Sequence, residues 1–513
     1  MHMSNLAIWG APGTGKTSAL IEKYLQKSGK KLIVTFSRST ADDIRKRLSD
    51  LNGEEVTKDE VNTIHGTCNC LLAEKKNVKL MKPNDYKRFE NDTGNKLSKP
   101  THDETEPSKS RGLVDCWGWM QNTGTPYKKI TKFPGWKELK IPPSQARKVI
   151  KDFQQWKLDN DKINFTDMLV EVLRHQLIPD CDVLLVDEFQ DLTALQFKII
   201  KLWSENIDTV IIAGDPLQSI YGFWGGSPEY FKQFDSEQTV LDKSYRLPAA
   251  IWEYACGLAN RYNMDIPKID TTAQEGKIDH LNYKQYLAHK SFWKGNKNFK
   301  VFHLVRSNYQ AARIAHEMAR EGILWAGISG WTKQEIIVLN ILIMAKHGIE
   351  KLVLSKSDIL AMLDQFPVNY FSYGGSKKSI KAAIEEEQYR DDYGPLFVGD
   401  SLYKILESPN PVNYMSNPSD LKYEKFQAAL EKYAEEVTWS EAEATVLTTI
   451  HGSKGLEADR VFLHTGISNK IKKEMRKDPA EEARVFYVGI TRSKEELIVV
   501  KDKGKNFPLT RRQ

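Results

Sequence analysis

The chain carries a phosphate-binding sequence close to its first residues. The loop consists of Gly10, Ala11, Pro12, Gly13, Thr14, Gly15, Lys16 and Thr17, which fits G-x-x-x-x-G-K-[ST] at every fixed position. Residues 5–9 before it predict a short buried strand, and residues 18–26 after it have apolar positions at helical spacing. Glycines let successive backbone N–H groups face phosphate oxygens, and a helix start adds positive potential. The order strand, loop, helix therefore predicts a nucleotide-binding site rather than a chance glycine loop.

Two residues of this loop are expected to act directly on the phosphates. Lys16 should reach the β- and γ-phosphates, and the Thr17 hydroxyl should ligate Mg²⁺. The remaining contacts of the loop are expected from Gly10, Ala11, Pro12, Gly13, Thr14, Gly15 and Ser18.

A second cluster follows an apolar run. Val183–Val186 predicts a strand buried on both faces, and it ends in Asp187 and Glu188. Carboxylates at the carboxyl end of a strand lie where α/β sheets bind ligands. We expect Asp187 to hold Mg²⁺ and Glu188 to polarise the water that attacks the γ-phosphate. The alternative is an acidic helix N-cap, which is common for one Asp but explains this pair poorly beside a phosphate loop.

Around these two clusters the sequence resembles the UvrD/Rep branch of the superfamily 1 helicases, in the family's motif order over nearly the whole chain. The matching segments are Val34–Ala41, Thr63–Gly66, Asp187–Asp191, Gly214–Tyr221, Ser244–Arg246, Thr449–Glu457 and Tyr487–Arg492. The last two segments favour the branch that moves 3′ to 5′ over the one that moves 5′ to 3′.

The resemblance implies roles for further residues. Gln218 would sense the γ-phosphate and couple it to the nucleic-acid groove, and Tyr245 would stack on adenine. Arg246 and Arg492 would neutralise charge on the γ-phosphoryl group, and Glu457 would help to bind the ribose and phosphate region. Taken alone, Tyr245 would more often be a core aromatic and Arg246 a solvated surface charge, and Gln218 would carry no information.

The resemblance also implies contacts with a nucleic-acid strand. These contacts are assigned to Thr35, Phe36, Thr63, His65, Tyr221 and Phe223.

The sequence departs from the family in three ways. Few residues precede the phosphate loop, so the family's adenine-reading glutamine motif is missing. Gly222–Gly225 has no arginine where the family commonly has Arg-Trp-Arg-Gly, and the chain is short for the family.

The expected fold class is α/β, with two RecA-like P-loop NTPase motor domains whose parallel sheets are each interrupted by a small accessory insertion. Strand signals at 301–305, 461–463 and 497–500 support the second sheet. The predicted domains are 1–66 plus 161–244, a basic insertion at 67–160, 245–350 plus 441–513, and an acidic insertion at 351–440.

The two insertions differ in charge. Residues 67–160 hold 19 Lys and Arg against 11 Asp and Glu, a net of +8, whereas residues 351–440 hold 10 against 14, a net of −4. Basic side chains with interleaved aromatics suit phosphates and stacked bases, so Lys128, Lys129 and Lys132 are expected on the nucleic-acid track. The alternative is a solvated face over a small aromatic core, in which Trp117 and Trp136 would be core residues. The acidic insertion is interpreted as regulatory or partner-facing.

The function expected from these features is an ATP- and Mg²⁺-dependent 3′-to-5′ DNA helicase that acts on single-stranded DNA and on junctions between single and double strands. Two alternatives remain: a translocase that displaces bound proteins with little unwinding, and a nucleic-acid-binding recruitment factor with weak ATPase activity. Replication or repair proteins are the expected partners, and a monomer is the expected state. Scattered cysteines, the absence of a signal-peptide pattern and the lack of a long apolar run predict the cytoplasm of a bacterial or phage-infected cell.

Overall fold

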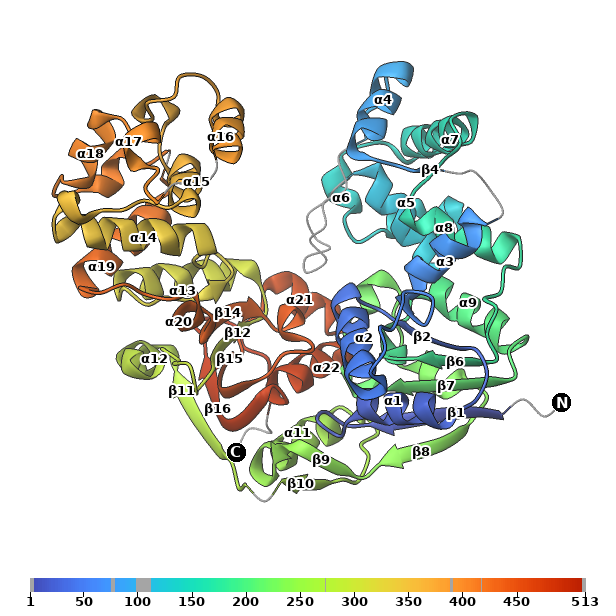
Figure 1. The fold of residues 1–513 in the computed structure, drawn as a ribbon. Helices are drawn as coiled ribbons and strands as arrows, with labels where there is room; N and C mark the ends of the chain where they lie inside the picture. Colours follow the sequence, from blue (N-terminus) through green and yellow to red (C-terminus); the bar gives the residue numbers. More distant parts are fainter. Residues whose placement is uncertain are drawn as a thin grey trace. The chain divides into compact units, whose positions relative to one another are not determined.

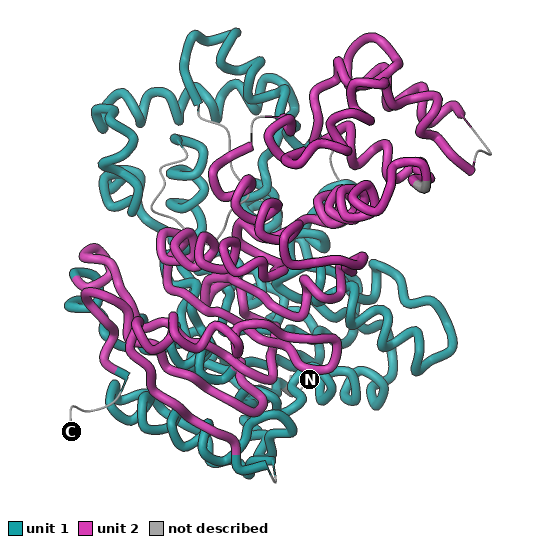
Figure 2. Tube along the Cα trace, turned by 90° about the vertical axis from the view of Figure 1, so that its left-hand side faces the viewer, with its two compact units in different colours: residues 1–275, 473–491, 509–513 teal, residues 276–472, 492–508 magenta. Residues whose placement is uncertain are grey.

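The computed structural model describes residues 4–74, 79–97, 112–272, 274–387, 391–416 and 418–509. The chain forms two compact units, which Figure 2 colours separately. Unit 1 comprises residues 1–275, 473–491 and 509–513, and unit 2 comprises residues 276–472 and 492–508. Each unit contains one six-stranded sheet in which all neighbouring strands are parallel. The prediction of an α/β fold with parallel sheets in two domains is confirmed.

The sheet of unit 1 has the strand order β3-β2-β6-β7-β1-β8. Its strands are β1 (Ser4–Gly10), β2 (Lys31–Thr35), β3 (Val61–Thr63), β6 (Val183–Val186), β7 (Thr209–Gly214) and β8 (Glu237–Leu241). The helices that cover it include α1 (Lys16–Gln26), α2 (Arg38–Asn52), α3 (Ile64–Ala73), α8 (Phe165–Arg174) and α9 (Ala194–Ser204).

The side chains of the strands alternate between the two faces of this sheet, and they form one apolar core on each face. Ile33, Leu185 and Ile211 pack with residues of α1 and α2 on one face. Leu184 and Ile212, one residue away in sequence from members of the first core, pack with α3, α8 and α9 on the other. Successive side chains of a strand point to opposite faces, so a continuous apolar run satisfies both layers. The central strands of the sheet are thereby buried between helices, as Figure 1 shows.

The basic insertion folds around an apolar core of its own within unit 1. Its helices are α4 (Pro83–Thr93), α5 (Leu113–Thr123), η1 (Tyr127–Lys132), α6 (Trp136–Leu139) and α7 (Pro143–Asp159). Phe89, Phe153 and Trp156 are buried at its centre, and Trp117 and Trp136 pack against them. These two tryptophans thus contribute to the core. Residues 75–78 and 98–111, which carry part of the predicted positive charge, lie outside the described residues.

The sheet of unit 2 has the strand order β11-β16-β15-β12-β14-β13. Its strands are β11 (Lys277–Asn282), β12 (Val301–Val305), β13 (Ala326–Gly327), β14 (Thr445–Thr449), β15 (Ala458–His464) and β16 (Ser493–Lys501). The three strands predicted in this half from the sequence coincide with β12 or fall inside β15 and β16.

The acidic insertion shares the core of unit 2. Its helices include α15 (Lys356–Gln365), α16 (Lys377–Glu386), α17 (Gly394–Phe397), α18 (Asp400–Leu406) and α19 (Asp420–Lys432), and they pack with α13 (Asn308–Arg320) and α14 (Lys333–Lys346), which precede the insertion. Helix α14 buries eight of its residues, and Ile359 of α15 and Phe426 of α19 belong to the same apolar cluster as Val305 of β12. This region therefore extends the second domain, unlike the basic insertion with its separate core.

Two segments belong to unit 1 although the predicted boundaries assign them to the second motor domain. Residues 245–275 contain the end of β9 (Lys243–Pro248), together with α11 (Ala249–Arg261) and β10 (Asp270–Thr272). Residues 473–491 contain α22 (Pro479–Ile490), which packs against α11. This grouping follows from packing between segments that are distant in sequence. Among the described residues, none of the helices combines the length and apolar character needed to cross a bilayer.

The separate core of the basic insertion leads to a first prediction. Phe153 and Leu158 lie on the same helix, but Phe153 is 1% exposed and Leu158 is 66% exposed. Phe153→Ala should lower the local opening free energy of α7 by about 3 kcal/mol or more, because truncating a buried Phe loses apolar burial and leaves a cavity.

Hydrogen–deuterium exchange of the α7 amides measures this change. Exchange should accelerate roughly 100-fold in Phe153→Ala, whereas the matched Leu158→Ala variant should stay within about 0.5 kcal/mol of the unchanged chain. Equal exchange in the two variants would contradict the packing described for this core.

Candidate nucleotide-binding site

The predicted catalytic residues of unit 1 gather at one edge of its sheet. Parallel strands place their carboxyl ends together, and here β1 leads into the phosphate loop, β6 into Asp187 and β7 into Asp215. Strands β2 and β3 end on the same edge at Thr35 and Thr63, which are register partners. Segments up to about 200 residues apart in sequence thus converge where α/β folds bind ligands.

The phosphate loop runs from the end of β1 into the first turn of α1. Gly13 and Gly15 have φ values of 76° and 81°, in the left-handed region that glycine adopts without a Cβ penalty. A Cβ on Gly13 would also lie 2.3 Å from the Arg246 Cβ. Lys16 is half-buried, and its Nζ donates to the Gly10 carbonyl at 3.0 Å. The loop thus combines a helix N-terminus with a cation held over its own backbone, an arrangement suited to phosphate.

Thr17 and Asp187 form the direct link between the phosphate loop and β6. The Thr17 hydroxyl donates to Asp187 Oδ2 at 2.8 Å. Burial raises the pKa of Asp187 to about 6, and the charge of Glu188 adds to this effect, while the Thr17 hydrogen bond opposes it. A divalent cation would offset the free-energy cost of burying this ionised carboxylate. Mg²⁺ binds oxygen ligands and usually takes only one or two protein carboxylates, so these donors fit it.

Glu188 is held in an uncommon backbone conformation. Its φ of 52° lies in the left-handed region, which costs a non-glycine residue roughly 1–3 kcal/mol. Its backbone N–H donates to Asp187 Oδ1 at 2.9 Å, and its carboxylate accepts a hydrogen bond from the Gln190 amide. Such strain persists only where neighbouring contacts hold it, which is common at catalytic positions.

Asp215 connects the end of β7 to Gln218. Its carboxylate accepts from Gln218 Nε2 at 2.8 Å and from Trp9 Nε1 at 3.4 Å, and all three side chains come from elements that meet at this edge. Burial raises the pKa of Asp215, while Lys16 lowers it. Gln218 is buried, and its hydrogen bond to Asp215 fixes the orientation of its side chain.

Residues 244–246 pack directly on the phosphate loop within unit 1. The Ser244 hydroxyl donates to the Pro12 carbonyl at 2.9 Å, and the Tyr245 N–H donates to the Gly13 carbonyl at 2.9 Å. Tyr245 is 71% exposed, and the Lys243 ammonium lies over its ring, 5.3 Å from the centroid. Arg246 lies against Gly13. The sequence interpretation assigned Arg246 to the second motor domain, but its position beside the loop comes from unit 1 itself.

A row of aromatic rings begins at the same edge. Phe36 and Tyr221 stack with ring centroids 5.6 Å apart and an interplanar angle of 18°, and Tyr221 meets Phe223 edge-on at 6.0 Å. Trp119 of the basic insertion donates from Nε1 to the Phe223 carbonyl at 2.7 Å. The three rings are partly exposed, and Tyr221 follows two residues after Ser219 in the chain. Aromatic faces of this kind stack bases without regard to sequence.

The other residues predicted to contact a strand lie nearby but have local partners. The Thr35 hydroxyl donates to the Ser37 carbonyl at 2.9 Å, and the Thr63 hydroxyl caps α3 by accepting from the Gly66 N–H at 3.0 Å. His65 meets Phe165 edge-on at 6.1 Å, and burial lowers its pKa to about 4. A neutral imidazole can exchange hydrogen bonds with a strand but adds no charge to hold phosphate.

The remaining predicted site residues fall into two groups. Lys128, Lys129 and Lys132 are exposed on η1 of the basic insertion. Arg492 and Glu457 belong to unit 2, where Arg492 is 1% exposed and donates to the Leu456 carbonyl at 3.2 Å. The contacts predicted for these two residues with a nucleotide stay predictions.

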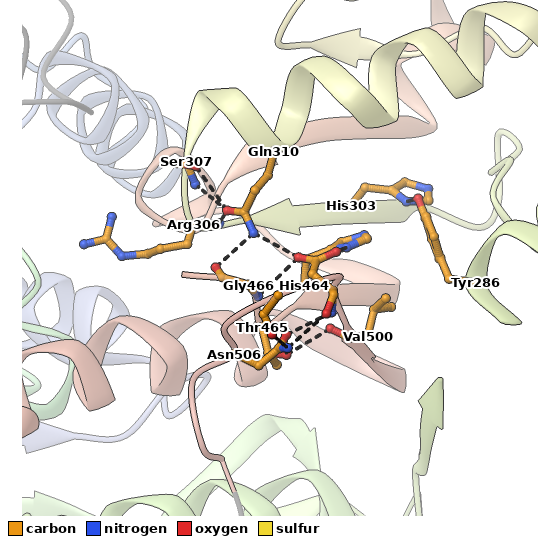
Figure 3. Close-up of polar contacts among 12 residues, drawn as sticks. Tyr286, His303, Arg306, Ser307, Gln310, His464, Thr465, Gly466, Val500 and Asn506 are labelled. Carbon is orange, nitrogen blue, oxygen red and sulfur yellow. Dashed lines mark hydrogen bonds and ion pairs between the residues drawn. The ribbon is translucent and has the colours of Figure 1, made fainter. Parts of the chain in front are cut away.

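Unit 2 has its own buried polar network at the carboxyl edge of its sheet (Figure 3). Gln310 Nε2 donates to Asp502 Oδ2 and to the Gly466 carbonyl, both at 2.9 Å. Gln310 Oε1 accepts from the Ser307 N–H at 3.0 Å, and His464 Nδ1 lies 3.1 Å from Asp502 Oδ1. Burial alone would raise the pKa of Asp502, but His464 and Gln310 lower it overall. The network fixes the loop after β12 to the ends of β15 and β16.

Several residues that complete the site were given no role in the sequence analysis. They are Trp9, Gln190, Asp215, Ser219, Ser244 and Arg484. Most of them stand inside segments already matched to the family, so the resemblance marked their neighbourhood. Nothing in residue type or spacing indicates that Arg484 Nε donates to the Ser219 carbonyl at 3.0 Å, a contact between residues 265 positions apart.

Comparison with known proteins agrees with this geometry. Residues 2–239 match the model of the UvrD/REP helicase N-terminal domain, and residues 399–504 match that of the UvrD-like helicase C-terminal domain. The chain is 23% identical to a probable DNA helicase II homolog of Mycoplasma capricolum over 591 residues, covering 96% of this chain and 80% of the relative.

Two further relatives are also similar to this chain over nearly its whole length. An ATP-dependent DNA helicase PcrA of Staphylococcus epidermidis is 23% identical, with 96% of this chain and 81% of the relative covered. The ATP-dependent DNA helicase srs2 of Schizosaccharomyces pombe is 22% identical, with 95% and 68% covered. A solved PRRSV helicase structure aligns with 97% of this chain and 52% of its own, at 11% identity and a TM-score of 0.33.

The geometry around Glu188 leads to a second prediction. Glu188→Gln should keep nucleotide binding but lower ATP turnover by at least roughly 100-fold, because an amide cannot accept a proton from water. Steady-state ATPase rates and binding of a fluorescent ATP analogue measure the two effects separately. The exposed Glu205→Gln variant is the control and should behave as the unchanged chain. Loss of nucleotide binding in Glu188→Gln would instead indicate a metal-ligand or structural role.

Proposed function

Because this chain belongs to the UvrD/Rep family of helicases, we propose that it is an ATP-driven motor that moves 3′ to 5′ along single-stranded DNA and separates duplex strands. One observation carries the proposal beyond family membership. The phosphate loop, the Asp187–Glu188 pair and the aromatic row share one sheet edge. Thr17 donates to Asp187 and Gln218 donates to Asp215, and Tyr221 of the row follows three residues after Gln218. Chemistry at the nucleotide can thereby alter the contacts of a nucleic-acid strand.

Each residue at this edge can be given a step in ATP hydrolysis. Lys16 and the loop N–H groups bind the phosphates, and the Tyr245 ring stacks on the adenine. Thr17 and Asp187 would hold Mg²⁺, which supplies positive charge against the phosphate oxygens. Glu188 orients a water molecule and accepts its proton as the oxygen attacks the γ-phosphorus. The bond to the ADP oxygen breaks, which releases ADP and phosphate.

Arginine and glutamine side chains complete this proposal. Arg246 lies beside the phosphate loop and can neutralise charge that develops on the transferred group. Arg492 and Glu457 are proposed to contribute from unit 2, as the resemblance implies. Gln218 is proposed to respond to the γ-phosphate, since it donates to Asp215, whose carboxylate is influenced by the charge of Lys16, and the segment after it leads to Tyr221.

Movement along the strand requires that ATP and ADP states grip it differently. A ligand shifts a conformational equilibrium only by its differential affinity for the two states. We propose that the γ-phosphate provides this difference through Gln218, and that Phe36, Tyr221 and Phe223 hold the bases. Thr35, Thr63 and neutral His65 would add hydrogen bonds to the backbone of the strand, and the junction with duplex DNA would be the working substrate.

Direction of movement gives the third prediction. Duplexes with a 3′ single-stranded tail should be unwound in the presence of ATP and Mg²⁺, and those with a 5′ tail should not. A gel-based strand-separation assay with both substrates measures this, and Glu188→Gln serves as the inactive control. A preference for the 5′ tail would contradict the proposed direction. ATP-driven displacement of a protein bound to single-stranded DNA, without strand separation, would favour the translocase alternative.

The exposed lysines of η1 give the fourth prediction. Lys128, Lys129 and Lys132 changed together to glutamate should weaken binding to single-stranded DNA and flatten its salt dependence. Each phosphate neutralised on a single strand contributes about −0.7 to the slope of log affinity against log salt, so the slope should change by up to about 2. Nucleotide affinity without DNA and sequence preference should stay the same, because phosphate contacts carry no direct base information.

A matched variant controls for the change of charge. Lys377, Lys378 and Lys404 are exposed on the acidic insertion, and their replacement by glutamate alters net charge equally. Fluorescence anisotropy over a range of salt concentrations compares the two triple variants. Equal slopes for both variants and the unchanged chain would mean that the η1 lysines form a solvated face and that the motor domains alone hold the strand.

A further inference from the structure

Gln190 lies at the centre of the site, yet neither the proposed cycle nor the family resemblance uses it. It is fully buried two residues after Glu188, in the short helix η2 (Phe189–Asp191). Its side-chain oxygen accepts from the Asp215 N–H at 2.9 Å. Because that N–H is a donor, the oxygen must face Asp215 and the NH₂ group must face Glu188, whose Oε2 accepts from it.

The surroundings leave room for Gln190 and hold its backbone. A Cβ on Gly214 would lie 2.5 Å from Gln190 Oε1, so the glycine at the end of β7 makes space for the amide. The Gln190 carbonyl accepts from the Ser219 hydroxyl at 2.9 Å, and Ser219 in turn accepts from Arg484 of α22. Both the side chain and the backbone of Gln190 therefore connect the end of β6 with the segment after β7.

We propose that Gln190 is a positioning residue for ATP hydrolysis: it orients the Glu188 carboxylate toward the reacting water and ties it to the backbone of Asp215. The inference rests on the proposed function of Glu188. Glu188 has a strained left-handed backbone and a half-exposed side chain, so its carboxylate needs a partner to keep a single orientation. A donor held by its own second hydrogen bond provides that orientation, because the amide cannot rotate without breaking both contacts.

This position also connects the water-orienting carboxylate to the nucleic-acid side of the site. Asp215 binds Gln218 through its side chain and Gln190 through its backbone, and Tyr221 of the aromatic row follows three residues after Gln218. A shift of the row on binding a strand would move the Asp215–Ser219 segment. Gln190 carries that shift to Glu188, which gives bound DNA a physical route to the rate of hydrolysis.

Gln190→Met tests the inference, because methionine keeps the length of the side chain and removes both hydrogen bonds. The kcat for ATP hydrolysis with single-stranded DNA should fall at least about tenfold, since a hydrogen bond to a charged group is worth more than that factor. KM for ATP should stay within about threefold. A lower kcat with an unchanged KM separates a positioning role from a general loss of folding, which would reduce both nucleotide binding and turnover.

Gln196→Met is the matched control. Gln196 is also buried in unit 1, and its side chain caps α9 by accepting from the Thr193 N–H at 2.9 Å. Loss of this bond should lower the thermal midpoint but leave kcat unchanged. If Gln190→Met does not fold, Gly214→Ala tests the same contact, since its Cβ displaces the Gln190 amide, and the same fall in kcat at an unchanged KM is expected.

Three results would overturn the inference. One is an unchanged kcat in the folded Gln190→Met variant, and another is a KM for ATP that rises in proportion to the fall in kcat. The third is the same kinetic loss in Gln196→Met. If the unchanged chain fails to hydrolyse ATP, the proposed function itself falls. If the unchanged chain hydrolyses ATP and the Gln190→Met variant has the same kcat, only the proposed role of Gln190 is contradicted.

Discussion

The hydrogen bond between Thr17 and Asp187 sets the position of everything else at the sheet edge. Asp187 follows a strand buried on both faces, so its carboxylate is removed from water before any ligand binds. Burying a charge without partners is costly, and the raised pKa of Asp187 expresses that cost. The Thr17 hydroxyl and the Glu188 N–H offset part of it, and they fix the start of α1 against the end of β6.

The burial of Asp187 also accounts for the left-handed backbone of Glu188 and for the position of Gln190. With Asp187 accepting from the Glu188 N–H, the chain turns through a left-handed residue, and η2 brings Gln190 back toward β7. Asp215 is buried beside it and must also be satisfied, which Gln218 and Trp9 achieve. Two buried carboxylates, each with defined partners, thus give the site a single arrangement. Fully satisfied polar networks of this kind specify one geometry at the expense of stability.

Local sequence signals were sufficient where a segment forms its own structure. The glycine spacing of the phosphate loop and the apolar run of β6 predicted the elements around Lys16 and Asp187 correctly. The signals failed where distant segments meet. No periodicity could show that Ser244 bonds Pro12, 232 residues earlier, or that α22 packs with α11 in unit 1. The charge difference between the two insertions said nothing of their cores, because a shared or separate core depends on tertiary packing.

The position of α22 gives the chain a short covalent route between its two units. This helix ends at Ile490 within unit 1, and Arg492, only two residues later, belongs to unit 2 and bonds the Leu456 carbonyl there. Arg484 of the same helix donates to the Ser219 carbonyl, and the Ser219 hydroxyl donates to the Gln190 carbonyl two residues after Glu188. Within unit 1, α22 is therefore held to the segment that follows β7, so a displacement of Asp215–Ser219 would be transmitted to this helix.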